Sequence, residues 1–288
     1  TLTTFPYPKA GEQNSAVKVG VVNLKDKKTR WADLKGDNRD RYIPRISWAG
    51  NGQSLLIQDV NRPQNTNKLW IFDWQAGDLT NIYTDKDEAF LEWFYDAKFI
   101  NNGQDFIWHS ERDGWRHLYK VSRDGQSIVD LTPGDYDIVD MLGVSEEKNA
   151  LFFTASPKDV SQRYLFKATL DGSEPVKRIT PEQYAGTNNY YMSEDTSWAR
   201  HSFSQFAAPN IRQVISVNDH KAIKSLVKNE KLKEQLAQEN LPNHEFFQVE
   251  ARDGVKLDGY IMFPPNMDKT KKYPIIFYVY GEPWGQTV

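Results

Sequence analysis

The sequence has no cysteine, no long apolar run and almost no net charge. Without cysteine, the chain can form neither disulfides nor thiolate metal sites, and it offers no thiol nucleophile. No apolar run approaches the ~20 residues that cross a bilayer, so we expect no transmembrane segment. The formal net charge is −3, and without a long basic run we expect no nucleic-acid partner, because phosphate binding needs clustered lysine and arginine.

What the sequence does contain is a weak internal repeat. Similar apolar stretches begin at Leu69, Leu118, Leu165 and Val214, separated by 49, 47 and 49 positions. Around each stretch the same order recurs, with a short strand, a turn, an apolar strand, a polar loop, the stretch itself and a closing strand. Units of four strands that repeat about every 40 to 50 residues are typical of β-propeller blades. We therefore expect the four stretches to be strands at equivalent places in successive blades.

The second unit shows the pattern most completely. Its strands are predicted at Lys98–Ile100, Asp105–Ser110, from Leu118 onward and at Ile128–Thr132. Asn-Gly and Asp-Gly pairs between them supply the positive φ that tight hairpins require. The first unit, over residues 17–34, has closing strands without a full set before them, so the propeller is entered partway through a blade.

The pattern changes after Ser225. Apolar residues from Leu226 fall at helical spacing until Pro242. Two strand-like stretches and a continuous apolar run, Pro274–Tyr280, follow. A run without polar alternation is typical of a strand buried on both faces of a parallel sheet. This succession resembles the beginning of an α/β domain.

The predicted organisation therefore has three parts. Residues 1–225 form a partial β-propeller of about four to five blades, residues 226–243 a helical connector, and residues 244–288 the N-terminal strands of an α/β domain. The last part, about 45 residues, is too short to build a core alone. Both ends of the chain look cut, and the fold class is mainly β.

Four motifs carry a family resemblance. They are PYPKAG from Pro6, SERDGWRHLY from Ser110, ITPEQ from Ile179 and FPPNMDKTKKYPIIFYVYGEP from Phe263. In content and order they resemble the dipeptidyl peptidase IV branch of the prolyl oligopeptidase family of serine peptidases. The resemblance implies an eight-bladed propeller on an α/β-hydrolase domain with a Ser-Asp-His triad, which releases dipeptides, often after proline, from free N-termini. This chain would hold the later blades and the first strands of the hydrolase domain.

The resemblance assigns one catalytic role within the chain, to Tyr280. Tyr-Gly-x-Pro after an apolar strand matches the family's oxyanion tyrosine, whose phenol donates a hydrogen bond to the oxygen that gains charge in acyl transfer. The alternative is an aromatic strand end packed for stability. Glu282 and Trp284 depart from the family's pattern, which leaves the conformation of the following loop open.

Two aromatic residues are candidates for substrate binding. Trp93 and Phe94 fall near the place where the family projects an aromatic side chain toward the substrate, and an aromatic wall there would pack against the second substrate residue. The alternative is that they belong to a blade core. The family also anchors the substrate's ammonium group with paired glutamates, but Glu146 and Glu147 stand in a predicted inter-strand turn and are expected to be solvated.

The chain has no Gly-x-Ser-x-Gly elbow, which an exposed serine nucleophile of this fold needs. The nearest stretch begins at Gly143 and lacks the second glycine, so we expect the chain by itself to be inactive. His109 and His117 flank a predicted turn and suggest a metal clip, but two ligands are fewer than structural zinc sites use. We predict no metal and no cofactor.

We thus interpret the chain as part of a serine exopeptidase. The resemblance further implies peptide substrates, a homodimeric parent and a periplasmic or otherwise extracytoplasmic location, which the residues themselves leave undetermined. The alternative is a non-enzymatic β-propeller module that binds proteins.

Overall fold

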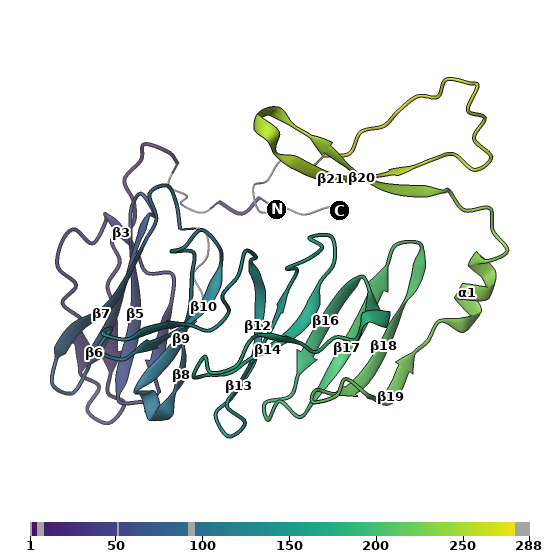
Figure 1. Cartoon of the computed structure of the whole chain (residues 1–288). Coiled ribbons are helices and arrows are strands. Elements are labelled where there is room, and N and C mark those ends of the chain that lie inside the picture. Colours follow the sequence, from purple (N-terminus) through teal and green to yellow (C-terminus); the bar gives the residue numbers. More distant parts are fainter. Residues whose placement is uncertain (1, 5–8, 51, 92–95, 280–288) are drawn as a thin grey trace. The chain divides into compact units, whose positions relative to one another are not determined.

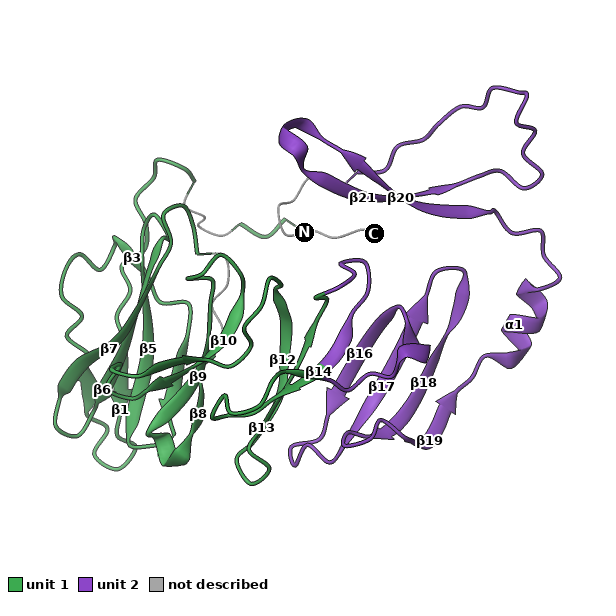
Figure 2. Cartoon of the chain, viewed as in Figure 1, with its two compact units in different colours: residues 1–157, 166–177 green, residues 158–165, 178–288 purple. Residues whose placement is uncertain are grey.

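In the computed structural model, the chain is described at residues 2–4, 9–50, 52–91 and 96–279. These residues form mainly β-structure, in antiparallel sheets (Figure 1). The chain divides into two compact units (Figure 2). Unit 1 comprises residues 1–157 and 166–177, and unit 2 comprises residues 158–165 and 178–288.

Unit 1 begins with a hairpin and a five-stranded sheet. The hairpin pairs β1 (Gly20–Val22) with β2 (Thr29–Trp31). In the sheet, β3 and β4 both pair with β5, which is followed by β6 and β7. These strands are β3 (Arg41–Tyr42), β4 (Ile46–Ala49), β5 (Ser54–Asn61), β6 (Thr66–Asp73) and β7 (Asp78–Lys86).

Two four-stranded sheets follow along the chain, each with its strands in sequence order. The first contains β8 (Lys98–Ile100), the 3-10 helix η1 (Asn101–Gly103) before β9 (Asp105–Ser110), then β10 (His117–Ser122) and β11 (Ile128–Asp130). The second contains β12 (Ile138–Ser145), β13 (Ala150–Ala155), β14 (Tyr164–Ala168) and β15 (Lys177–Arg178).

Unit 2 contains a further four-stranded sheet, a short helix and a hairpin. After the 3-10 helix η2 (Glu182–Tyr184), the sheet is built from β16 (Thr187–Met192), β17 (Trp198–Gln205), β18 (Ala208–Ser216) and β19 (Ala222–Val227). The helix is α1 (Glu230–Leu236). The hairpin pairs β20 (His244–Glu250) with β21 (Lys256–Met262) through the 3-10 turn η3 (Arg252–Gly254).

The predicted repeat is confirmed. Leu69, Leu118, Leu165 and Val214 lie in β6, β10, β14 and β18. Each of these strands is third in a consecutive run of four, namely β4–β7, β8–β11, β12–β15 and β16–β19. The side chains of the three leucines are fully buried, because an inner strand is paired on both edges and covered on its faces. Successive four-stranded antiparallel sheets of this kind match the predicted blades.

The core of unit 1 lies between its first two large sheets. One buried cluster joins residues of the β4–β7 sheet, among them Leu56 and Leu69, to Phe106, Trp108 and Tyr119 of the β8–β11 sheet. A second cluster packs the β1–β2 hairpin and its flanks onto β5 and β6. Alternating side chains thus fill the space between neighbouring sheets, as blade-to-blade packing requires.

The structure departs from the sequence pattern at two places in unit 2. The helical spacing begins at Leu226, but β19 extends through Val227, since its backbone pairs with β18, and α1 begins only at Glu230. Residues 274–279 form no strand, and Ile276 and Phe277 are 95% and 86% exposed. A doubly apolar strand needs neighbours on both edges, and the described residues provide none for it. Among the described helices none is long and apolar enough to cross a membrane.

Candidate functional site

The three residues that the sequence singled out for catalysis and substrate binding, Tyr280, Trp93 and Phe94, lie outside the described residues. The segment before the two aromatics is held by Leu91, which is buried and whose N–H donates to the carbonyl of Gln64 at 2.8 Å. After them, Phe99 packs against the core of unit 1. Both flanks of residues 92–95 are therefore anchored to the blade.

Glu282 and Trp284 also lie outside the described residues, whereas Glu146, Glu147, His109 and His117 lie within them. Glu146 and Glu147 are exposed in the turn between β12 and β13, where a carboxylate oxygen of Glu146 accepts the N–H of Asn101 at 2.6 Å. The expected turn is confirmed. His109 pairs with Leu118 and His117 with Ser110 across β9 and β10, so the two imidazoles project from opposite faces of the sheet and form no clip.

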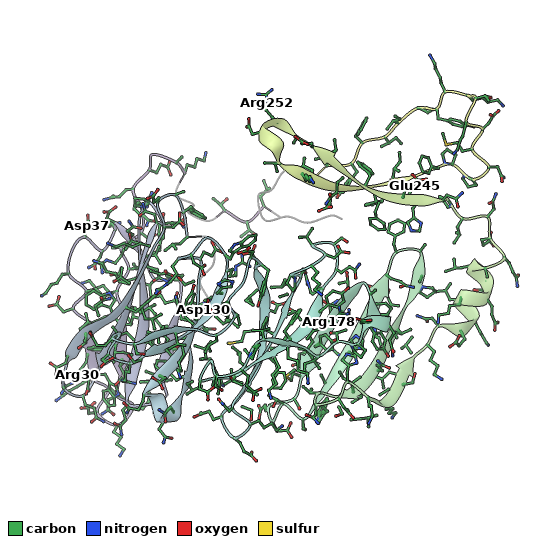
Figure 3. The ribbon with its side chains drawn as sticks, in the orientation of Figure 1. Arg30, Asp37, Asp130, Arg178, Glu245 and Arg252 are labelled. Carbon is green, nitrogen blue, oxygen red and sulfur yellow. The ribbon has the colours of Figure 1, made fainter. Side chains whose placement is uncertain are left out.

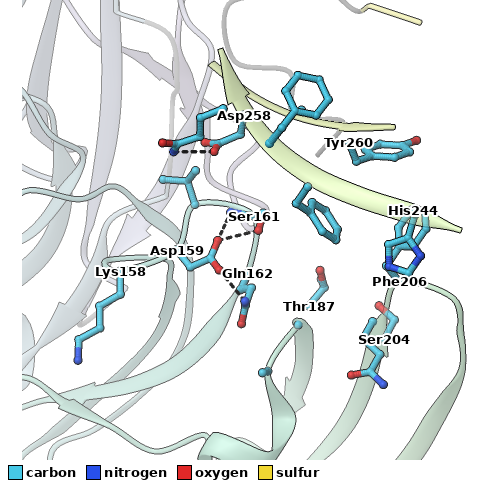
Figure 4. A pocket seen from close by; sticks show the side chains of 18 residues that line it. Lys158, Asp159, Ser161, Gln162, Thr187, Ser204, Phe206, His244, Asp258 and Tyr260 are labelled. Carbon is cyan, nitrogen blue, oxygen red and sulfur yellow. Dashed lines mark hydrogen bonds between the residues drawn. The ribbon is translucent and has the colours of Figure 1, made fainter. Parts of the chain in front are cut away.

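A cavity in unit 2 is the candidate site among the described residues (Figure 4). It measures about 1230 Å³, more than the roughly 300–1,000 Å³ typical of small-molecule sites. Its lining comes from the loop before β14, the start of β16, the turn after β17 and both strands of the β20–β21 hairpin, at residues 158–162, 185–187, 204–206, 244, 246–248 and 258–260.

Aromatic side chains form one wall of the cavity. Phe206 stands in the two-residue turn between β17 and β18, where Gln205 pairs with Ala208. Its ring lies 4.3 Å from the ring of His244, 5.1 Å from Tyr260 and 5.7 Å from Phe246, measured between centroids. Edge-on and tilted contacts of this kind are favourable between aromatic rings. Phe206 thus connects the last sheet to the hairpin.

Polar groups also line the cavity. Asp159 accepts hydrogen bonds from Ser161, through the backbone N–H at 3.0 Å and the hydroxyl at 2.6 Å, and from the side-chain amide of Gln162 at 2.6 Å. On the hairpin, the amide of Gln248 donates to Asp258 at 2.9 Å across paired positions. These carboxylates are held by local donors, which fixes them as hydrogen-bond acceptors at the surface of the cavity.

Gly186, which lines the cavity, makes a close backbone approach. Its φ is +148°, and a Cβ atom there would stand 2.5 Å from the carbonyl oxygen of Ser204. Only glycine fits this position. The approach lets the N–H of Arg163 donate to the Gly186 carbonyl at 3.0 Å, so the loop before β14 is joined to the start of β16.

A buried polar network supports the sheet behind the cavity. Asn188 donates to three backbone carbonyls, so its side-chain oxygen is an acceptor and receives the Nε2 proton of His201 at 2.8 Å. The other nitrogen of His201 accepts from Gln213 at 3.1 Å. Tyr190 joins His220 at 2.8 Å to Thr180 at 2.7 Å. The two imidazoles are 4.9 Å apart between ring centroids.

Burial governs the protonation of this network. Desolvation, together with a smaller effect of the neighbouring His220, lowers the pKa of His201 to about 3. Desolvation also lowers the pKa of His220 to about 4, against the opposing charge of Asp219. Both imidazoles are therefore neutral at pH 7. Arg178 (Figure 3) covers the ring of Tyr164 at 3.6 Å and donates to the Thr180 carbonyl at 2.8 Å, which closes the network on one side.

The cavity can bind but offers no assembled nucleophile. Ser161 donates to Asp159, and His244 packs against Phe206, so neither takes part in the serine-to-histidine hydrogen bond of nucleophilic catalysis. A cavity lined by aromatic faces and hydrogen-bonding groups is suited to an extended peptide or to another ligand with both apolar and polar groups. Sequence reasoning missed Phe206, His244 and Tyr260 because their proximity depends on how the hairpin folds back, and no local pattern encodes that.

Comparisons with known proteins show similarity to the N-terminal region of dipeptidyl peptidase IV. Residues 1–210 match the family model of the dipeptidyl peptidase IV (DPP IV) N-terminal region. A probable dipeptidyl peptidase 4 of Emericella nidulans is 24% identical over 98% of this chain and 38% of its own length. A dipeptidyl peptidase 4 of Arthroderma otae is 26% identical over 98% of the chain and 37% of its own length. The chain therefore spans less than two fifths of these relatives.

Two crystal structures resemble this one. The dipeptidyl peptidase 4 of Porphyromonas gingivalis superposes with a TM-score of 0.86 at 26% identity, covering 94% of this chain and 38% of that one. A putative dipeptidyl aminopeptidase IV of Bacteroides ovatus gives a TM-score of 0.83 at 25% identity, covering 98% of this chain and 42% of its own.

Proposed function

The chain belongs to the family of the dipeptidyl peptidase IV N-terminal region, and from this premise we propose that it is part of a serine peptidase that releases dipeptides from the free N-termini of peptides, often after proline. The observation that carries the proposal is the match of residues 1–210 to that region. Residues 1–225 would supply propeller blades, and residues 244–288 would begin the hydrolase domain. The chain by itself would be inactive, and the whole peptidase would be a homodimer acting on peptides.

Within this proposal the chain supplies positioning and electrostatic groups. Tyr280 would donate its phenolic hydrogen to the oxygen that becomes negative in the tetrahedral intermediate, an interaction that is stronger in the transition state than in the bound substrate. Trp93 or Phe94 would pack against the second residue of the substrate. The cavity of unit 2, with its aromatic wall and fixed carboxylates, would present peptide-binding surface where the last sheet meets the hairpin.

The test uses Tyr280→Phe in the peptidase that contains these residues. The substitution removes one hydroxyl and keeps the ring, so the fold should persist while kcat and kcat/KM fall together by a factor on the order of 10² to 10³, with KM and Tm little changed. Kinetics on a Gly-Pro anilide, normalised by active-site titration, measure this. A near-normal kcat per titrated site, with or without lost stability, would assign Tyr280 to packing instead.

A further inference from the structure

Three ligand-type side chains converge at one end of the β8–β11 sheet in unit 1. His117 opens β10, and Asp130 (Figure 3) ends β11, opposite Tyr119 in the strand register. His117 and Tyr119 are two residues apart and thus project from the same face as Asp130. The turn between β9 and β10 brings Asp113 over this face, so that one imidazole nitrogen and one oxygen from each carboxylate lie within 4.8 Å of one another.

A single hydrogen bond does not explain why two carboxylate oxygens lie near the same imidazole nitrogen. Nδ1 of His117 lies 2.9 Å from Oδ2 of Asp113 and 3.6 Å from Oδ2 of Asp130. The one proton on Nδ1 serves Asp113, and the second carboxylate approaches the same nitrogen from beyond hydrogen-bond range. Two carboxylates facing one nitrogen repel each other unless a cation stands between them.

Each carboxylate is oriented by a donor on its other oxygen. The N–H of Trp115 binds Oδ1 of Asp113 at 3.2 Å, and the N–H of Thr132 binds Oδ1 of Asp130 at 2.9 Å. Both Oδ2 atoms are thereby directed at His117. Hydrogen bonds that fix the remote oxygen of a carboxylate are the outer-shell arrangement found around metal ligands.

Neighbouring positive charges are engaged elsewhere. Arg116 binds Glu111 at 3.0 Å, and the guanidinium of Arg112 lies over the rings of Tyr83 and Tyr119 at 5.1 and 4.9 Å. In the part of the chain that the structure describes, the ion pairs of Asp113 and Asp130 are both with His117. The hydroxyl of Tyr119 also donates to Asp113, but among charged groups the two carboxylates have only this imidazole in the described part of the chain, and an added cation would complete their charge compensation.

We propose that Asp113, His117 and Asp130 bind a divalent cation of the zinc class. Nδ1 and the two Oδ2 atoms would be the protein ligands, and water would complete a tetrahedron. Ligands about 2.0–2.2 Å from a tetrahedral zinc ion are roughly 3.3–3.6 Å apart, so Asp113 must retreat from Nδ1 by only a few tenths of an ångström. One imidazole with two carboxylates suits zinc better than calcium or magnesium, which prefer oxygen ligands alone.

The environment allows the ring to change tautomer. The His117 side chain is 2% exposed, whereas those of Asp113 and Asp130 are 41% and 27% exposed, so the carboxylates give the ion its entrance. Nε2 of His117 has no hydrogen-bond partner among the described residues, so the ring can carry its proton on Nε2 without breaking a hydrogen bond there. The cost of an unpaired buried N–H is small beside metal–ligand binding.

The bound ion would clip the β9–β10 turn to β11. This role differs from peptide hydrolysis and requires neither the nucleophile nor the substrate. The ligand set also differs from the pair of histidines that the sequence suggested, His109 and His117, because its three members lie on one face of the sheet.

Isothermal titration of the tag-free full chain with Zn²⁺ tests the proposal. We expect one ion per chain with a dissociation constant in the micromolar range or below, and at least about a tenfold loss of affinity in Asp113→Asn and in Asp130→Asn. Both asparagines keep an acceptor for the backbone N–H. Asp124→Asn is the matched control, because Asp124 is an exposed aspartate in the β10–β11 turn of the same sheet, with its own local donors.

Two further readouts report on the site. Zn²⁺ should raise the Tm of the wild type and of the control, because a ligand stabilises only the fold that binds it. The Tm of the two site variants should stay the same when Zn²⁺ is added. Co²⁺ should give the visible absorption of a tetrahedral site in the wild type and in Asp124→Asn, but not in the two site variants. Asp113 lies in an exposed turn, so its variant should fold even where Asp130→Asn does not. Binding weaker than about millimolar, or equal binding by wild type and Asp113→Asn, would overturn the proposal.

Discussion

His201 and His220 show how single residues of this chain respond to their surroundings. Both are almost fully buried, and the partners of His201, Asn188 and Gln213, leave it one proton on Nε2. A second proton on either ring would place positive charge in a desolvated site beside another imidazole. The buried site therefore favours the neutral form of both rings.

This arrangement predicts acid lability of unit 2. The folded-state pKa values, about 3 and about 4, are lower than the ordinary value of histidine, so the unfolded chain binds protons first as the pH falls. The contribution to stability is therefore complete above about pH 6.5 and is lost on acidification toward pH 4, with a slope of up to ~1.4 kcal/mol per pH unit for each histidine. Urea unfolding at a series of pH values measures it.

A substitution isolates the effect. His220 has a φ of +56°, a conformation that asparagine tolerates, so His220→Asn should fold. In this variant the free energy of unfolding should depend less steeply on pH, by the contribution of one protonation site, up to ~1.4 kcal/mol per pH unit. His244→Gln, outside the network, serves as the control and should keep the wild-type slope. An unchanged slope in His220→Asn would contradict the assignment.

At the residue scale, the sequence was informative only where a motif was local. The turn at Glu146 and Glu147 follows from the local sequence and is confirmed. The placement of His109 and His117 on opposite faces of the sheet follows from their strand register. The grouping of Asp130 with His117 depends on the β10–β11 register, and the Phe206 cluster depends on a fold-back of the chain. Both groupings join residues that are far apart in the sequence, and a local sequence pattern does not specify such contacts.

At the scale of elements, the repeat was predictable because each blade closes its own hydrogen bonds within about 50 residues. The second unit matches the prediction closely, since β8 and β9 have the expected bounds. The helix and the last apolar run were harder to predict. Helical spacing from Leu226 competes with strand pairing to β18, and the run from Pro274 has the composition of a buried strand but no partner among the described residues.

The hairpin's attachment to the last sheet yields a prediction for elements. Phe206→Ala removes three ring contacts with the β20–β21 hairpin, each worth roughly 0.5–1.5 kcal/mol. Amide hydrogen exchange should accelerate in β20 and β21 and remain unchanged in β16–β18. Tyr191→Ala, at a position that is 70% exposed on β16, is the control. Equal exchange of the hairpin amides in both variants would show that the ring contacts do not hold it.

At the scale of the whole molecule, nearly the full length of this chain aligns with relatives that are much longer than it. We therefore expect residues 1–288, purified by themselves, to release no chromophore from Gly-Pro anilides between about pH 5 and pH 9, because the serine elbow required for acyl transfer is not in the sequence. Turnover that copurifies with the chain and resists removal of contaminating peptidases would show that a nucleophile within these residues had been overlooked.

The central proposal, that this chain is part of a dipeptide-releasing peptidase, is tested most directly by the specificity of the protein that contains the chain. Mass spectrometry of the products from a peptide with a free N-terminus and proline at its second position should show release of the N-terminal dipeptide. The same peptide with an acetylated N-terminus should remain intact, because recognition of the free ammonium defines this class of exopeptidase. Cleavage of both peptides at the same rate, or of neither by a correctly folded protein, would contradict the account.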